Sequence, residues 1–156
     1  MKGDFTMSHA NDANLNNAIN AYIANIGVSY IKLHNLHWNV VGPQFKAVHE
    51  YLESLYDAFA DVLDETAELL KMAGVQPVAS LKGYLAIATI QELGDEAVDQ
   101  KKALEITLAD LELLRDQALA IRKAADAHDC FGVANLMEDH VTNYAKQIWF
   151  LRSMLA

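Results

Sequence analysis

Residues 34–53 read HNLHWNVVGPQFKAVHEYLE, and they contain the clearest helix boundary in the sequence. Gly42 and Pro43 separate two segments in which apolar residues recur every three or four positions, as on one face of a helix. Proline cannot continue a helix, and it disfavours helical geometry in the residue before it. One helix therefore ends here and another begins at once. The same stretch holds three of the six histidines of the chain, next to two glutamates.

The apolar pattern predicts four long helices in a chain of 156 residues that has only two prolines and seven glycines. The predicted fold class is all-α: a four-helix bundle with a short extra helix in the middle connection, which could be the long crossover of the ferritin-like variant. Ser80 is a possible cap of the short helix. We expect a flexible N-terminal tail at 1–13 and a single bundle domain at 14–156. The expected helices cover about 14–38, 44–73, 79–88, 94–125 and 129–155.

The charge balance limits the partners that this chain can have. Twelve basic and 21 acidic residues give a net charge of -9, which repels phosphate backbones and attracts cations. Direct DNA binding is not expected, since the first residues contain one lysine and no basic arm. No segment has the length and apolarity of a membrane span or the pattern of a signal peptide, and Cys130 is the only cysteine. These features predict a cytoplasmic protein.

Four residues of the predicted second helix could bind metal. His49 and Glu53 are four positions apart, and so are Asp64 and Glu68. At about 100° per residue, Glu53, Asp64 and Glu68 lie at roughly 40°, 60° and 100° from His49, so all four share one sector. Each pair alone is typical of a solvated surface. Glu53 and Asp64 are also about 16 Å apart along the helix, too far for one metal ion.

Two copies of the helix can bring these residues together. An antiparallel partner that crosses at 58–59 would place His49 and Glu53 of one chain beside Asp64 and Glu68 of the other, with two equivalent sites per dimer. The rival site inside one bundle would need Glu-x-x-His on two helices, and the chain contains no such motif.

A further ligand comes from the preceding helix. His37 and His49 are symmetric about Pro43, so an antiparallel hairpin sets them at one level. His34, one turn earlier, is the competing candidate, although we interpret it as an ordinary surface or core histidine. His128 and His140 are interpreted in the same way, as surface histidines or as neighbours of the ligands. Imidazole with carboxylate suits iron, manganese or zinc.

The segment HNLHWNVVGPQFKAVHEYLESLYDAFADVLDETAELL resembles the signature of the Dps family, the miniferritins named for DNA protection in starved cells. The resemblance implies a ferroxidase centre shared across a two-fold interface. Glu53 stands where the family commonly has Asp, and its longer side chain could contact the second iron, bind through water or form a salt bridge. The ligands implied by the resemblance are His37, His49, Glu53, Asp64 and Glu68.

The resemblance also implies an activity and an assembly. The expected function is iron storage and detoxification: each shared site binds two Fe(II), oxidises them with hydrogen peroxide in preference to oxygen, and supplies ferric oxide to a hollow dodecamer, which protects against oxidative stress. Zinc is a possible competitor at the site. Trp38, beside His37, would intercept radicals or serve as a packing anchor. Asp126 and Asp129 would line iron-entry pores, or else cap the last helix.

Three other functions remain open at this stage. A DNA-compacting protein would need the basic arm that this chain lacks. A zinc-binding or structural assembly would use the same ligands without redox chemistry. An interaction protein, such as a surface-exposed immune stimulant, would need a targeting sequence, which we do not find.

Overall fold

The computed structural model describes residues 9 and 11–156. Most of the expected flexible tail lies outside these residues. Within the described residues the chain forms α1 (Ala13–Asn39), β1 (Val40–Val41), α2 (Phe45–Met72), α3 (Leu81–Ile87), β2 (Val98–Asp99), α4 (Gln100–Ala127) and α5 (Phe131–Leu155).

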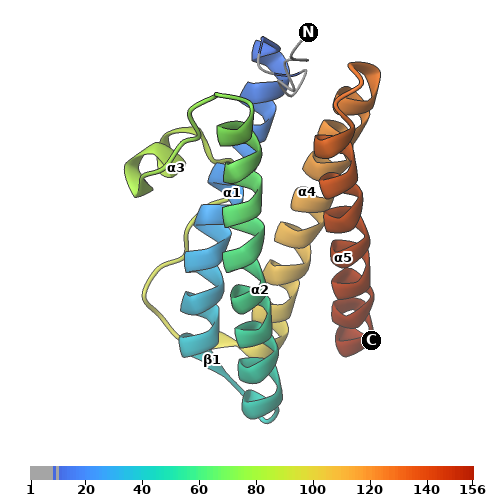
Figure 1. The fold of residues 1–156 in the computed structure, drawn as a ribbon. Coiled ribbons are helices and arrows are strands. Elements are labelled where there is room, and N and C mark those ends of the chain that lie inside the picture. Colours follow the sequence, from blue (N-terminus) through green and yellow to red (C-terminus); the bar gives the residue numbers. More distant parts are fainter. Residues whose placement is uncertain (1–8, 10) are drawn as a thin grey trace, which may run out of the picture.

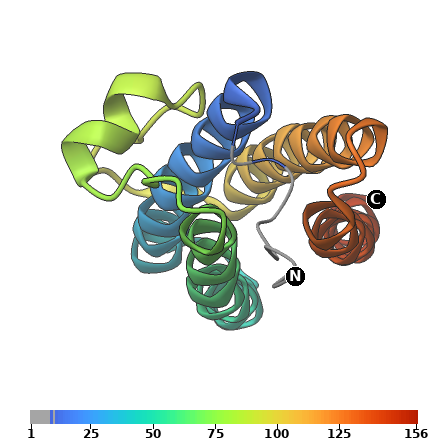
Figure 2. The same ribbon diagram turned by 45° about the horizontal axis from the view of Figure 1, so that its top comes forward.

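The four long helices form an elongated bundle, and the short helix α3 lies outside it beside α1 (Figures 1 and 2). α1 and α2 form a hairpin, and α4 and α5 form a second one. The connection between the hairpins runs the length of the bundle, so that α2 and α4 point the same way. This arrangement confirms the predicted ferritin-like bundle with a short helix in a long crossover.

Local hydrogen bonds explain where the helices begin. The Asp12 side chain accepts a hydrogen bond of 2.9 Å from the Leu15 amide at the start of α1. Ser80 accepts one of 3.0 Å from the Gly83 amide, which confirms the predicted cap of α3. Such caps satisfy amides that have no partner inside the helix.

The third long helix begins later than predicted. We expected it near Gly94, but α4 starts at Gln100, where the Asp99 side chain accepts a hydrogen bond from the Lys102 amide. The residues before Asp99 are extended, and β2 pairs in parallel with β1, with Val40 opposite Val98. This strand pair was not predicted, because a strand of two residues is too short to show an alternation of apolar and polar positions. The pairing fastens the end of the crossover to the turn between α1 and α2.

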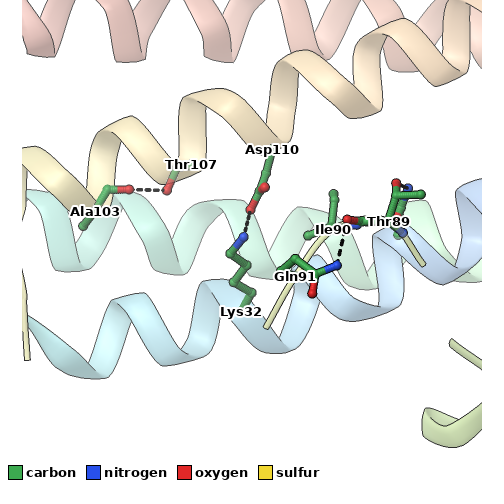
Figure 3. A network of polar contacts seen from close by, with 8 residues as sticks. Lys32, Thr89, Ile90, Gln91, Ala103, Thr107 and Asp110 are labelled. Atoms are coloured by element: carbon green, nitrogen blue, oxygen red, sulfur yellow. Dashed lines mark hydrogen bonds and ion pairs between the residues drawn. The ribbon is translucent and has the colours of Figure 1, made fainter. Parts of the chain in front are cut away.

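Buried polar groups also hold the crossover and α4 against α1. The Asn25 carboxamide oxygen accepts hydrogen bonds from the amides of Thr89 and Ile90, at 2.9 and 3.0 Å. Lys32 of α1 and Asp110 of α4 point toward each other and form an ion pair of 2.7 Å (Figure 3). Their side chains are 8% and 19% exposed. Burial raises the pKa of the Asp110 carboxyl, and Lys32 opposes part of that shift.

The buried face of α5 differs in part from the face that the apolar periodicity of the sequence predicts. Phe131, an apolar residue near the start of the predicted helix 129–155, is 71% exposed, whereas Val133, Met137 and His140 are buried. α5 packs mainly along α4, so the buried stripe follows the positions that face that helix. His140 is thus a buried histidine rather than a surface one.

Candidate metal centre

His37 and His49 meet at the end of the bundle where α1 passes into α2. Their imidazole rings are stacked, with centroids 3.6 Å apart and planes inclined by 16°. The prediction that the two histidines lie at one level on neighbouring helices is therefore confirmed. His37 is buried and His49 is half-buried.

Hydrogen bonds fix the protonation pattern of both rings. The Nδ1 of His37 bonds to the backbone oxygen of His49 at 2.7 Å, and the Nδ1 of His49 bonds to the backbone oxygen of His37 at 2.7 Å. A carbonyl oxygen only accepts hydrogen bonds, so each Nδ1 carries the proton. In the neutral rings, each Nε2 then keeps its lone pair, and neither Nε2 has a hydrogen-bond partner among the described residues. This is the tautomer that a metal-binding histidine requires.

His34 has a different environment. Its Nδ1 donates to the Tyr30 backbone oxygen at 2.7 Å, and its ring is stacked on Tyr56 at 3.7 Å between centroids. His34 thus belongs to an aromatic group on the same side of the hairpin, and it does not share the reciprocal bonds of His37 and His49.

The three carboxylates lie on the exposed side of α2. Glu53, Asp64 and Glu68 are all exposed, and the helix separates Glu53 from Asp64 by about 16 Å. Among the described residues, no three or more His, Cys, Asp or Glu side chains lie close enough to hold a metal ion. The structure therefore brings together the two histidines but not the carboxylates. One chain holds only part of the predicted ligand set.

Glu53 has a local partner that the sequence did not suggest. The pKa of the Tyr56 phenol is raised, first by desolvation and then by the negative charges of Glu53 and Asp57, with a hydrogen bond to Glu53 contributing. Glu53 is thus placed near the aromatic group that contains His34.

Trp38 does not pack into the protomer. Its side chain is 68% exposed, and its ring lies 5.5 Å from the ring of His34. The packing-anchor interpretation is therefore wrong within one chain, and the exposed indole lies beside His34.

Asp126 lies in the last turn of α4 and Asp129 in the connection to α5, and neither caps a helix. Cys130 is the N-cap residue of α5 and makes no side-chain capping bond. Asp129 has a left-handed backbone, with φ 57°, and Asp126 lies 3.5 Å from Arg122 in an ion pair. Both carboxylates are exposed, so the capping alternative is wrong, and a role at a pore stays a prediction.

A buried polar network that was not predicted from the sequence lies between the helices. His140 Nε2 lies 2.6 Å from a Glu65 carboxylate oxygen, and His140 Nδ1 lies 3.0 Å from the Tyr22 hydroxyl. The Tyr22 and Tyr144 hydroxyls are 2.6 Å apart. Tyr22 and Tyr144 fit the apolar periodicity of their helices, and the only signal in the sequence is that a buried phenol needs a hydrogen-bond partner.

Comparison with known proteins identifies the family. The model of the ferritin-like domain matches residues 16–156. DNA protection during starvation protein 2 of Bacillus anthracis is 35% identical over 139 residues, which cover 88% of this chain and 93% of that protein. The chain belongs to the Dps family of ferritin-like proteins.

Solved structures of related proteins match the whole bundle. The crystal structure of antigen TpF1 from Treponema pallidum has a TM-score of 0.91 at 31% identity and covers 97% of both chains. The Dps protein of Vibrio cholerae, described as a member of the ferritin-like diiron-carboxylate superfamily, has a TM-score of 0.88 at 29% identity, with 92% and 89% covered. Within residues 9 and 11–156 of this Dps protein, none of the helices has the length and apolarity that a membrane span requires.

Proposed function

We propose that this Dps protein is an iron-storage and detoxification ferroxidase that uses hydrogen peroxide as its preferred oxidant. The observation that carries the proposal is the reciprocal bonding of His37 and His49, which leaves two Nε2 atoms available on one side of the hairpin. Imidazole nitrogen together with carboxylate oxygen is a donor set that suits iron. The related protein of Vibrio cholerae is described as a diiron-carboxylate protein, which supports the same chemistry here.

The proposed site is shared between two chains. Since Asp64 and Glu68 are too far from the histidine pair of their own chain, they would serve the histidines of an antiparallel partner. Glu53, on the same helix as His49, would be the fifth ligand. In this arrangement a two-fold dimer has two sites, and each site would take two Fe(II) as substrate.

Pairing of two Fe(II) explains why peroxide would be a safe oxidant. Two Fe(II) supply two electrons, which together reduce one hydrogen peroxide to two hydroxide ions. A single Fe(II) supplies one electron and leaves a hydroxyl radical. Trp38, exposed beside the histidines, would reduce radicals that escape from this reaction.

Assembly and iron entry complete the proposal. We propose that two-fold dimers build a homo-oligomeric shell, as a dodecamer, in the cytoplasm. Its acidic surface would attract Fe(II), and Asp129 and Asp126 would line the entrance. Arg122 already pairs with Asp126, so Asp129 would supply more of the free negative charge.

DNA protection would act through this chemistry rather than through binding. The relative in Bacillus anthracis is named for DNA protection during starvation. The net charge of -9 of the present chain opposes direct contact with phosphates. A gel shift at low salt without divalent metal should show no complex, and a complex under these conditions would favour the DNA-compacting alternative.

The first test measures anaerobic Fe(II) oxidation by stoichiometric peroxide. The variant Asp64→Ala, Glu68→Ala should lose rapid oxidation at about two Fe(II) per peroxide and should release hydroxyl radicals to a spin trap. The matched control is Glu112→Ala, Asp116→Ala, which removes an acidic pair of the same spacing from α4. Equal behaviour of both variants and the wild type would refute the site. A protein that binds zinc without consuming peroxide would favour the structural alternative.

A second test asks whether the site is shared. Chains with His37→Ala, His49→Ala are mixed in equal amounts with chains carrying Asp64→Ala, Glu68→Ala, then unfolded and reassembled. Each variant alone should be inactive. If chains pair at random, half of the dimers contain one chain of each kind. Each of these mixed dimers has one complete site and one defective site, so about a quarter of the wild-type activity should return. No recovery by a reassembled mixture would mean that the ligands come from one chain.

A further inference from the structure

The bundle interior contains a hydrogen-bonded chain that includes none of the proposed metal ligands, although its last member, Glu65, follows Asp64 on α2. It consists of Tyr144, Tyr22, His140 and Glu65, in that order. Tyr22 comes from α1, Glu65 from α2, and the other two from α5. Tyr22 is 0% exposed, and Tyr144 and His140 are each 3% exposed. The Glu65 side chain is 43% exposed, so the network runs from the core to the surface.

The direction of each hydrogen bond follows from its acidic end. A carboxylate accepts, so Nε2 of His140 carries the proton that binds Glu65. In the neutral ring Nδ1 is then an acceptor, and the Tyr22 hydroxyl donates to it at 3.0 Å. The Tyr22 oxygen in turn accepts from the Tyr144 hydroxyl at 2.6 Å. Every donor therefore points from the core toward Glu65.

We infer that Tyr22 is a redox-active tyrosine that gives one electron to strong one-electron oxidants, such as hydroxyl radical, and passes its proton to His140. The electron reduces hydroxyl radical to hydroxide. The O–H bond of Tyr22 breaks, a bond forms between its proton and Nδ1 of His140, and a neutral tyrosyl radical remains. An external one-electron reductant, such as Fe(II), restores the phenol when the proton returns.

Burial makes His140 necessary for this step. An electron can leave a buried ring through packed neighbours, but a proton needs a hydrogen-bonded acceptor. Tyr22 cannot lose its proton beforehand, because desolvation first and then Tyr144 raise the pKa of its phenol well above 10.0. The imidazolium formed on His140 would be stabilised by the Glu65 carboxylate at 2.6 Å. The Tyr144 hydroxyl would continue to donate to the Tyr22 oxygen and would stabilise the radical.

Tyr51 provides an internal comparison. Its hydroxyl donates to the side-chain oxygen of Gln147 at 2.9 Å. Burial raises the pKa of this phenol as well. A carboxamide oxygen is a very weak base, so Tyr51 has a hydrogen-bond acceptor but no acceptor for its proton. Tyr51 should not hold a radical.

The inference does not depend on the proposed iron site, because the oxidant can be made without iron. Azide radicals generated by pulse radiolysis oxidise the metal-free assembled protein, and the tyrosyl radical is followed by optical absorption and rapid-freeze electron paramagnetic resonance. We expect a long-lived tyrosyl radical in the wild type and in Tyr51→Phe, and a loss of at least tenfold in its yield in Tyr22→Phe. Assembly and thermal unfolding are measured for each variant.

The variant His140→Gln separates proton transfer from structure. Glutamine can accept from Tyr22 and donate to Glu65, but it cannot hold the transferred proton. We expect its radical yield to fall about as far as that of Tyr22→Phe while the assembly stays intact. A radical of wild-type yield in either Tyr22→Phe or His140→Gln would overturn the inference, whatever the outcome of the iron experiments.

Discussion

His37 and His49 each donate a hydrogen bond from Nδ1 to the backbone oxygen of the other, both at 2.7 Å. The side chains thus join the last turn of α1 to the first turns of α2, and they orient their rings without help from a metal ion. Such preorganisation lowers the cost of binding a metal.

The variant His49→Gln should weaken metal binding strongly. Its carboxamide can still donate to the His37 backbone oxygen, but it offers no ring nitrogen as a ligand. We expect the affinity for Co(II), a spectroscopic substitute for Fe(II), to fall by about 100-fold or more. Mutation of a residue that only hydrogen-bonds to a metal ligand already lowers metal affinity by about 10–100-fold, and His49 is itself a proposed ligand. His34→Gln is the control and should bind nearly as the wild type does. The reverse ranking of the two variants would assign the site to His34.

Removal of one partner of the ion pair between Lys32 and Asp110 should lower the free energy of unfolding strongly. Asp110→Ala leaves a buried ammonium without a counter-charge, and we expect it to lower the free energy of unfolding by about 3 kcal/mol. The double variant Lys32→Met, Asp110→Leu should recover most of this loss, because it removes both charges from an apolar site. Urea denaturation measures both. A double variant as unstable as Asp110→Ala would show that the charges themselves stabilise the fold.

Tyr144 should make the protein sensitive to alkali. Burial raises the pKa of this phenol above 10.0, and the negative charge of Glu65 adds to the shift. Above pH 10 the unfolded chain loses the Tyr144 proton while the folded chain keeps it, so unfolding is favoured as pH rises. The contribution to the slope is up to about 1.4 kcal/mol per pH unit. Tyr144→Phe should reduce the slope of unfolding free energy against pH above 10, and parallel slopes would contradict this account.

Gly27 should be intolerant of a larger side chain because α3 packs against it. A Cβ at this position would lie 2.6 Å from a ring carbon of Tyr84. α3 has no fully buried residue of its own, so Gly27→Ala should displace it from α1, at a cost of about 1–3 kcal/mol. Hydrogen exchange at the amides of Tyr84 and Ala88 would report the loss. Gly94→Ala, whose Cβ would meet only Glu96 at 3.7 Å, is the control. Unchanged protection in Gly27→Ala would contradict the packing argument.

Much of the fold could be predicted because it rests on local signals. The Gly42–Pro43 turn, the Ser80 cap and the helical periodicity are all visible in a few neighbouring residues. The late start of α4 could not be found in this way, since it depends on the Asp99 cap and on a strand pair between residues far apart in the chain. Phe131 shows a similar limit: periodicity places it on α5 but does not show which face meets α4.

The candidate metal centre could likewise be predicted only in part. Symmetry about Pro43 predicted the contact of His37 with His49, because a tight hairpin sets the register. The orientation of their Nδ1 atoms required coordinates. The network of Tyr22 and His140 spans three helices, and no spacing within one helix could reveal it. The role of Asp64 and Glu68 depends on a second chain and stays a prediction.

The distance between Glu53 and Asp64 along one helix also bears on the activity of a newly synthesised chain before it assembles. If the site requires two chains, a single protomer lacks ferroxidase activity even when it is fully folded. At low protein concentration the number of complete sites would then grow with the square of the number of chains, because each site needs an encounter. Oxidation of Fe(II) would begin only once enough protein had accumulated for chains to pair. The ferric product would then form at an interface where two chains already meet.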